Sequence, residues 1–361
     1  MVKYPKDYSP IMEYYSQIRD SKVIVSKKIR RIYQKLAEDL SGSTGADGTV
    51  YHYSPSRANH ILEFAENYCR HSKGKLGGQL VVLELWEKAM LAAMFGFIDD
   101  EGRRRYREVV LIVAKKNGKS LISSIVGLYL QVGDGEPGAE VYAVATKKDQ
   151  AKIIWGEAKR MVNKSPELRK LIKPLVGEMD CAANESVFKP LASDTDTLDG
   201  LNVHGALMDE VHQWRDGMAL YDIIADGTTA REQPMTLITT TAGVVREDIY
   251  DNKYEYAAKV IIGYDDSDAG IVDDHFLPFI YELDAREEWE DERCWPKANP
   301  GLGTIKNIRQ LRDKVRKAQQ SPDLQRNLLC KEFNIRETTG GSWLSFDDIN
   351  NETAFDVAEL R

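Results

Sequence analysis

The chain has 361 residues, of which 42% are hydrophobic, so it can form one large α/β core with lobes, or two domains. No apolar run approaches the ~20 residues of a membrane span, and the start, MVKYPKDYSPIMEYY, lacks the apolar stretch of a signal peptide. We therefore expect an intracellular protein that is neither secreted nor bound to a membrane. The four cysteines are scattered without C-x-x-C pairing, which argues against a disulfide framework and a zinc site.

The net charge of -8 hides an uneven distribution. The charged residues of SKVIVSKKIRRIYQK (residues 21–35) are all basic, and GRRRYREVV adds four arginines between Arg103 and Arg107. For these stretches, a surface that faces phosphates and a plain solvated face both remain open. The acidic stretch from 264 to 292 is expected to be solvated surface.

The predicted elements begin with helices over residues 1–70, followed by a glycine-rich joint, KGKLGGQL. From there apolar strands alternate with helices, which predicts a parallel sheet covered on both faces. After the break CWPKANPGLGT, helices return from Ile305 to about Glu332. The expected strands are 108–114, 139–146, 186–192, 203–209 and 234–241, with helices after the first two, at 119–131 and 147–162.

The stretch VLIVAKKNGKSLISSIVGLYL (residues 110–130) resembles a phosphate-binding loop without its first glycine. In the pattern G-x-x-x-x-G-K-[ST], Val113 stands where that glycine belongs, and Gly118, Lys119 and Ser120 complete the motif. A buried strand before the motif and a helix after it supply the context that such a loop needs. Val113 is tolerated there if it simply ends the strand.

The residue types in the loop predict how each residue would contact ATP and Mg²⁺. Lys119 is expected to reach the β- and γ-phosphates, and Ser120 to hold Mg²⁺. Asn117 with Gly118 is expected to form the left-handed part of the turn. Lys115 and Lys116 add two cations beside the phosphates.

An acidic pair ends the later apolar strand VHGALMDEVH. Ligands bind at the carboxyl ends of strands in such sheets, so Asp209 is expected to contact the Mg²⁺ shell. Glu210 is expected to orient and deprotonate the attacking water.

The hydroxyl-rich strand LITTTAG follows in the sequence. Its threonines, Thr239, Thr240 and Thr241, are expected to contact the γ-phosphate or its water and to signal the nucleotide state to a neighbouring element. An ordinary threonine-rich strand is the plain alternative.

Together these segments resemble the large terminase subunit of tailed bacteriophages, the motor that packages double-stranded DNA. The resemblance takes in the basic N-terminal helices and the following segments: FAENYCRHSKGKLGGQLVVLELWEKAMLAAMFGF, RRRYREVVLIVAKKNGKS, TLDGLNVHGALMDEVHQW, REQPMTLITTTAG and CWPKANPGLG. In that family the glycine-poor loop is normal.

The resemblance implies a P-loop NTPase of the additional-strand, RecA-like type. It implies Walker roles for Lys119, Ser120, Asp209 and Glu210, a phosphate contact for a basic residue at Lys115, and coupling by Thr239 to Thr241. It also implies double-stranded DNA, a portal protein and a small terminase subunit as partners, and a homo-oligomeric ring in the host cytoplasm when assembled. A ring motor needs an arginine at the site, and the candidates are Arg231 and Arg160.

Two departures from the family pattern affect these expectations. The adenine-reading motif usually has Trp-Gln, whereas this chain has Trp86 and Glu87, and glutamate accepts but does not donate. The second departure is that the family's nuclease domain, and hence nuclease activity, is expected to be absent.

The expected domains are an N-terminal helical region (1–75), a P-loop ATPase core (76–275), and the end of the ATPase lobe with a helical linker (276–361).

Two other functions remain open on the sequence. DEVH (Asp209 to His212) also matches the D-E-x-H box of nucleic-acid helicases, although a helicase needs a second motor domain. A nucleotide-gated assembly module is the other alternative, and Glu210 speaks against it because binding alone needs no catalytic carboxylate.

Overall fold

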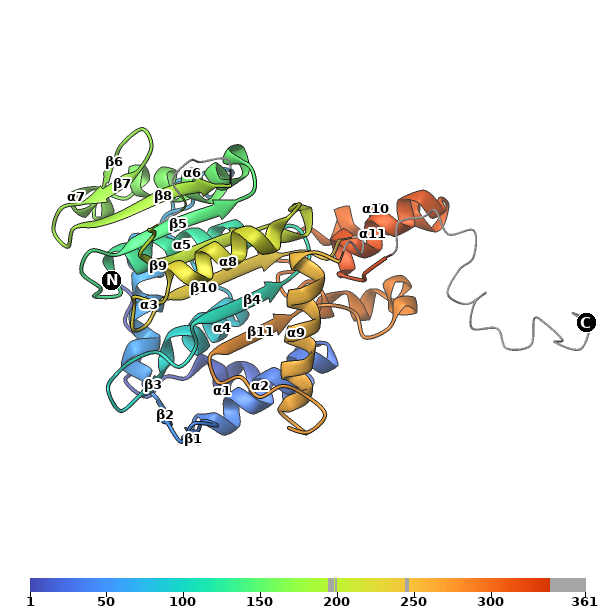
Figure 1. Cartoon of the computed structure of the whole chain (residues 1–361). Coiled ribbons are helices and arrows are strands. Elements are labelled where there is room, and N and C mark those ends of the chain that lie inside the picture. The colour runs from blue at the N-terminus through green and yellow to red at the C-terminus, as the bar shows by residue number, and fades with distance from the viewer. Residues whose placement is uncertain (194–197, 199, 244–246, 338–361) are drawn as a thin grey trace, which may run out of the picture.

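The computed structural model describes residues 1–193, 198, 200–243 and 247–337. Its centre is an eight-stranded sheet in the order β11-β4-β10-β9-β5-β8-β7-β6 (Figure 1). The six strands from β11 to β8 are parallel, and β7 and β6 extend the sheet as an antiparallel edge. The strand bounds are β4 Glu108–Ile112, β5 Glu140–Ala145, β6 Lys173–Pro174, β7 Met179–Cys181, β8 Ser186–Ala192, β9 Val203–Asp209, β10 Met235–Thr240 and β11 Phe276–Ile280. The predicted, mainly parallel α/β sheet is confirmed.

Helices cover both faces of this sheet. The direction in which each helix crosses from one strand to the next determines the face on which the helix lies. The helices α5 and α6 connect strands that advance from β4 toward β8, whereas α8 and α9 connect strands that advance from β9 toward β11. Because parallel crossovers are right-handed, opposite directions put the two pairs of helices on opposite faces (Figure 1). Their bounds are α5 Lys119–Val132, α6 Lys148–Lys164, α8 Gly217–Gly227 and α9 Ile249–Gly263, and the short α7 (Leu168–Leu171) follows α6.

The strand β10 lies between β4 and β9, and this insertion positions the site. Thr239 stands opposite Asp209 on one side and opposite Leu111 on the other. All six residues of β10 are buried, as are the last four of β4, which is why these strands form the centre of the sheet. The carboxyl ends of β4, β10 and β9 therefore lie together at the same end of the sheet.

The edge strand β11 was not predicted, because FLPFI lies inside the acidic stretch that we expected to be solvated surface. All five of its residues are buried, and it pairs with β4 from Phe276 opposite Glu108 to Ile280 opposite Ile112. The expectation for 264–292 was therefore wrong over these five residues.

The N-terminal region is helical, as predicted, but it also contains a three-stranded antiparallel sheet. Its elements are α1 Pro10–Arg19, α2 Lys27–Asp39, β1 Ser43–Thr44, β2 Val50–Tyr53, α3 Pro55–Tyr68, α4 Leu85–Gly96 and β3 Phe97–Asp99. Two basic residues of α2 form ion pairs with residues of the ATPase core: Lys28 pairs with Glu282, and Arg31 pairs with Asp265. Much of this basic stretch therefore fastens α2 to the core.

The arginines before β4 are structural in the same way. Arg104 pairs with Asp134, and Arg105 bridges Asp39 and Asp274. Both guanidinium groups are buried.

The C-terminal segment leaves the sheet after β11 and forms a small lobe beside the carboxyl ends of the strands (Figure 1). It contains the 3-10 turns η2 Arg286–Glu290 and η3 Glu292–Lys297 and the helices α10 Ile308–Gln319 and α11 Pro322–Phe333. A separate hydrophobic cluster holds it together, built around Trp289, Trp295, Leu311 and Phe333. Among the described residues, no helix is long and apolar enough to cross a membrane.

Candidate ATPase site

The phosphate loop begins where β4 ends. Val113 is fully buried, and its backbone N–H donates to Thr240 O (3.1 Å), so it continues the pairing of β4 with β10. A residue in this extended position needs no glycine, which explains the valine at the start of the motif.

The tight turn of the loop is formed by Lys116 (φ 69°) and Gly118 (φ 82°). The prediction for Gly118 is confirmed, but Asn117 does not take the left-handed conformation. Its buried side chain braces the loop instead: Nδ2 donates to Ala114 O (3.0 Å) and Asn299 Oδ1 (3.1 Å), and Oδ1 accepts from Gly301 N (3.1 Å). The segment after η3 thus supports the phosphate loop.

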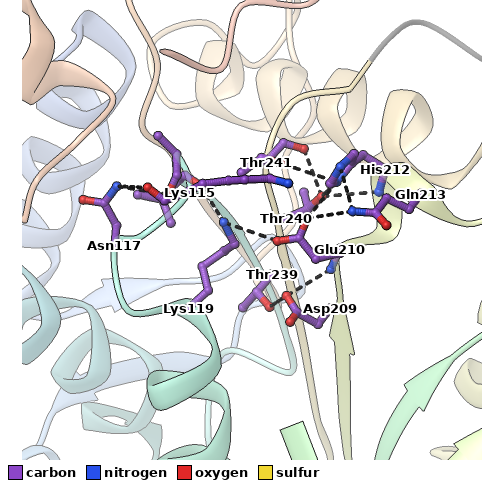
Figure 2. Close-up of polar contacts among 12 residues, drawn as sticks. Lys115, Asn117, Lys119, Asp209, Glu210, His212, Gln213, Thr239, Thr240 and Thr241 are labelled. Atoms are coloured by element: carbon purple, nitrogen blue, oxygen red, sulfur yellow. Dashed lines mark hydrogen bonds and ion pairs between the residues drawn. The ribbon is translucent and has the colours of Figure 1, made fainter. Parts of the chain in front are cut away.

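Lys119 opens α5 and crosses the loop toward β9. Its Nζ donates to Val113 O (2.9 Å) and lies 3.6 Å from Glu210 Oε1 (Figure 2). Burial lowers the pKa of this ammonium group, while the two carboxylates of Asp209 and Glu210 oppose that shift. Lys119 shares a hollow of about 300 Å³ with Lys115, Lys116, Gly118, Ser120, Leu121, Glu210 and Gln213.

Asp209 ends β9 and is held by β10. Its Oδ1 accepts from Thr239 Oγ1 (2.8 Å) and from Glu210 N (3.0 Å). Burial raises the pKa of Asp209 to about 6, with a further contribution from the neighbouring Glu210 carboxylate. An Asp carboxylate together with the Ser120 hydroxyl is a donor set of hard oxygens, which fits Mg²⁺, and a bound cation would favour the ionised form.

Glu210 has a left-handed backbone (φ 52°, ψ 40°), which costs a non-glycine residue on the order of 1 kcal/mol. Its backbone N–H donates to Thr239 O (2.8 Å), and this bond fixes the bend at the end of β9. The bend turns the carboxylate toward Lys119, and about a quarter of the side chain is exposed. The structure therefore brings Lys119 and Glu210 together, and places the Asp209 carboxylate beside them (Figure 2).

The three threonines divide between two partners (Figure 2). Thr239 bonds to Asp209, whereas Thr240 Oγ1 and Thr241 Oγ1 lie 3.0 and 3.5 Å from Nδ1 of His212. His212 also lies 3.4 Å from Glu210 Oε2. Only the DEVH box pointed to His212 in the sequence, because the register of two separate strands is what brings His212 to the threonines.

Trp86 and Glu87 lie in the first turn of α4, beneath the phosphate loop. Both are buried, and the Trp86 ring packs edge-on against Tyr281 with centroids 5.6 Å apart. Glu87 Oε2 accepts from Glu84 N (2.9 Å), while Oε1 lies 3.1 Å from the position of a methyl group on Gly118. Oε1 has no hydrogen-bond partner among the described residues, and burial raises the pKa of Glu87 to about 8. Glu87 is therefore set to carry its proton near neutral pH.

Arg231 does not reach this site. It precedes β10, at the opposite edge of the sheet, where its guanidinium bonds to Glu136 (2.8 Å) and Gly138 O (2.7 Å). Within its own chain Arg231 therefore does not contact the site, and its catalytic role stays a prediction. Arg160 lies on α6, half-exposed, and pairs with Glu157.

A larger cleft of about 900 Å³ adjoins the phosphate hollow and shares Lys115 and Gln213 with it. Residues of α11 form its far wall. Five cationic side chains and a single acidic one, Asp323, line it; the cations are Lys115, Lys147, Arg215, Arg326 and Lys331.

The strand order, with β10 inserted between the phosphate-loop strand and the acidic strand, defines a P-loop ATPase fold of the additional-strand, RecA-like type. Two family profiles match the chain: "Terminase large subunit, ATPase domain" over residues 85–259 and "Terminase large subunit, endonuclease domain" over residues 270–361. The chain belongs to the terminase large subunit family.

Two relatives that match the chain are distant in sequence. The chain is 25% identical to the large terminase subunit of Enterobacteria phage HK97 over 298 residues, covering 80% of this chain and 55% of that protein. It is 22% identical to the terminase large subunit of Lactococcus phage SK1 over 326 residues, covering 88% and 56%. The crystal structure of the HK97 large terminase shares the fold, with a TM-score of 0.65 and 23% identity over 78% of this chain and 55% of that one. This chain thus spans about half the length of these relatives.

The endonuclease profile corrects one expectation. We predicted that the nuclease domain and its activity are absent, but the profile matches residues 270–361. The match begins inside the ATPase sheet, since β11 (Phe276–Ile280) pairs with β4, and it continues through α10 and α11. The acidic residues near the end of the chain, such as Asp347 and Asp356, lie outside the described residues.

Proposed function

We propose that this chain is the ATPase motor of a phage terminase, which couples ATP hydrolysis to the translocation of double-stranded DNA into a procapsid. The observation that carries the proposal is the convergence of Lys119, the first residue of α5, and Glu210, the residue after β9, whose side chains lie 3.6 Å apart. Enzymes that hydrolyse a nucleoside triphosphate place a lysine of the phosphate loop beside a carboxylate at the end of a second strand.

Each group has a role in that reaction. ATP phosphates lie on the loop N–H groups at the start of α5, where Lys119 neutralises charge on the β- and γ-phosphates, and Lys115 and Lys116 add to the positive potential. Glu210 accepts a proton from water as the water oxygen attacks the γ-phosphorus and the bond to ADP breaks. Mg²⁺, held by Ser120 and Asp209, would neutralise charge on the phosphate oxygens.

Coupling follows from the position of β10. Thr239 bonds to Asp209, and β10 continues into Ala242, whose N–H donates to Asn334 Oδ1 (2.9 Å) just after α11. Any shift of the acidic pair during hydrolysis can therefore move the C-terminal lobe through one strand.

The partners are proposed from family membership. They are double-stranded DNA, a portal protein, a small terminase subunit and further copies of this chain in a ring, in the host cytoplasm. Because α2 and the arginines before β4 are largely paired internally, the cationic cleft beside the site is the better-suited surface for phosphates. His212 completes a D-E-x-H box, but family membership favours a packaging motor over a helicase.

The test of the proposal is ATP turnover by the wild type and by Lys119→Ala. Phosphate release with Mg²⁺ and ATP, and nucleotide binding by calorimetry, are expected from the wild type, and both should be weakened in Lys119→Ala. Lys148→Ala removes an exposed cation from the start of α6 and should behave as the wild type. A wild type without turnover, or equal turnover in Lys119→Ala, would contradict the proposal.

Duplex DNA binding gives an independent check. Because the overall charge is -8 and the cations are local, binding should be weak, independent of sequence and steeply dependent on salt. Tight binding to one sequence that resists salt would argue against it.

A further inference from the structure

The His212 imidazole lies between the proposed base and the coupling threonines (Figure 2). Nδ1 is 3.4 Å from Glu210 Oε2 and 3.0 Å from Thr240 Oγ1. The His212 backbone N–H also donates to Thr240 Oγ1 (3.3 Å). A methyl group on Gly243 would lie 3.0 Å from His212 Cβ, so the side chain also packs closely against the residue that follows the threonine strand.

The neighbours of the ring indicate where its proton lies. The Gln213 amide, Nε2, is 3.3 Å from Glu210 Oε2 and 3.4 Å from His212 Nε2. An amide nitrogen only donates, so His212 Nε2 accepts from it and Nδ1 carries the hydrogen. Thr240 Oγ1 donates to Thr241 O (3.0 Å), which leaves its lone pairs for the His212 donors. The Nδ1–H therefore faces the Glu210 carboxylate and the Thr240 hydroxyl, and the Thr241 hydroxyl lies slightly farther away, at 3.5 Å.

From this geometry we propose that His212 is a positioning residue that holds the Glu210 carboxylate for water activation and transmits its orientation to Thr240 on β10. The proposal rests on the ATPase function above and deepens it. One N–H shared between two acceptors can favour either of them, so a change at Glu210 alters the bond to Thr240. Glu210 and β10 are thereby linked through a side chain, in addition to the direct bond from Thr239 to Asp209.

A merely structural histidine would act differently. The His212 ring could simply support the η1 turn (Val211–Gln213), and its loss would then lower stability without a specific effect on turnover. The two roles separate in kcat, because positioning of a base affects the chemical step, whereas ATP affinity depends on the phosphate loop.

The experiment measures kcat and KM for ATP in His212→Ala, His212→Asn and Thr240→Val, and in the double variant His212→Ala/Thr240→Val. Asparagine places an amide near Nδ1 and can still donate. Thr236→Val, in the same strand but at the far end of β10, is the matched threonine control, and His52→Ala, on β2, is the histidine control. Thermal melting of each variant reports folding.

We expect His212→Ala to lower kcat about 10- to 100-fold with KM changed less than about twofold, as for a misplaced catalytic group. His212→Asn should recover part of kcat, and the double variant should lose little more than His212→Ala, because the two residues act as a unit. Both controls should match the wild type.

Three outcomes would overturn the proposal: wild-type kcat in folded His212→Ala, a loss confined to KM, or independent losses that multiply in the double variant. If His212→Ala does not fold, His212→Asn and Thr240→Val carry the test, and wild-type kcat in both would overturn it. Wild-type protein that does not turn over ATP would instead refute the ATPase proposal, so the two failures are distinguishable.

Discussion

The buried carboxyl group of Glu87 makes the stability of the protein depend on pH in a defined direction. Burial raises its pKa from the ordinary 4.5 to about 8, and the hydrogen bond from Glu84 N opposes this only in part. Glu87→Gln replaces the protonated acid with an amide of nearly the same shape that never ionises. We therefore expect this variant to fold and to be less sensitive to alkaline pH than the wild type.

The magnitude follows from the two pKa values. Because the pKa in the folded state is raised, the unfolded chain loses this proton first. The stability contributed by protonated Glu87 is fully present below pH 4.5 and is lost as the pH rises through about 8. With about 1.36 kcal/mol per pKa unit, wild type should lose about 3 kcal/mol relative to Glu87→Gln between about pH 5.5 and about pH 8.5.

The assay is chemical denaturation of the wild type, Glu87→Gln and the control Glu290→Gln at several pH values across this range. Glu290 is exposed, so its variant should follow the wild-type curve. The difference in unfolding free energy between wild type and Glu87→Gln should grow steadily with pH. A difference that stays constant within about 0.5 kcal/mol, the usual size of a surface effect, would refute the reasoning.

Three further substitutions test other parts of the structure. Asn117→Ala removes the buried acceptor of Gly301 N, so we expect about 2 kcal/mol of destabilisation and weaker ATP binding, measured by denaturation and calorimetry; unchanged values would contradict the bracing role. Arg104→Ala removes the guanidinium from buried Asp134, which keeps its contact with His204 Nε2 (2.8 Å), so we expect about 3 kcal/mol of destabilisation, at the low end for a broken buried ion pair; an unchanged melting temperature would count against it. Arg231→Ala should leave kcat for ATP unchanged because this guanidinium is bonded at the far edge of the sheet, and a 100-fold fall in kcat would restore it as a catalytic candidate.

Local sequence was sufficient where a residue's role depends on its own strand or turn. The apolar runs expected at 108–114 and 203–209 predicted two functional strand ends, because burial and β-branched content act locally. Val113 also followed from its own strand, since an extended residue there needs no glycine.

The rest depended on partners distant in the chain. Asn117 was predicted as part of the turn, yet its main role is a contact with Asn299, 182 residues away. The strand β11 was hidden in an acidic segment, and only its pairing with β4 explains its burial. Arg231 looked close to the coupling strand in sequence but lies at its amino end, and His212 meets Thr240 only through the register of two strands. Such long-range pairing is not encoded in a short window of sequence.

The central claim, that Glu210 activates water at a site built by Lys119, Asp209 and Thr239, is tested most directly by Glu210→Gln. Glutamine keeps the shape but cannot take the proton, while the phosphate loop that binds ATP is untouched. The measurement is ATP affinity by calorimetry together with single-turnover phosphate release, for wild type and variant under the same conditions. We predict affinity within about threefold of wild type and a rate of hydrolysis lower by at least about 100-fold. Hydrolysis at the wild-type rate in the folded, ATP-binding variant would contradict the assignment of Glu210.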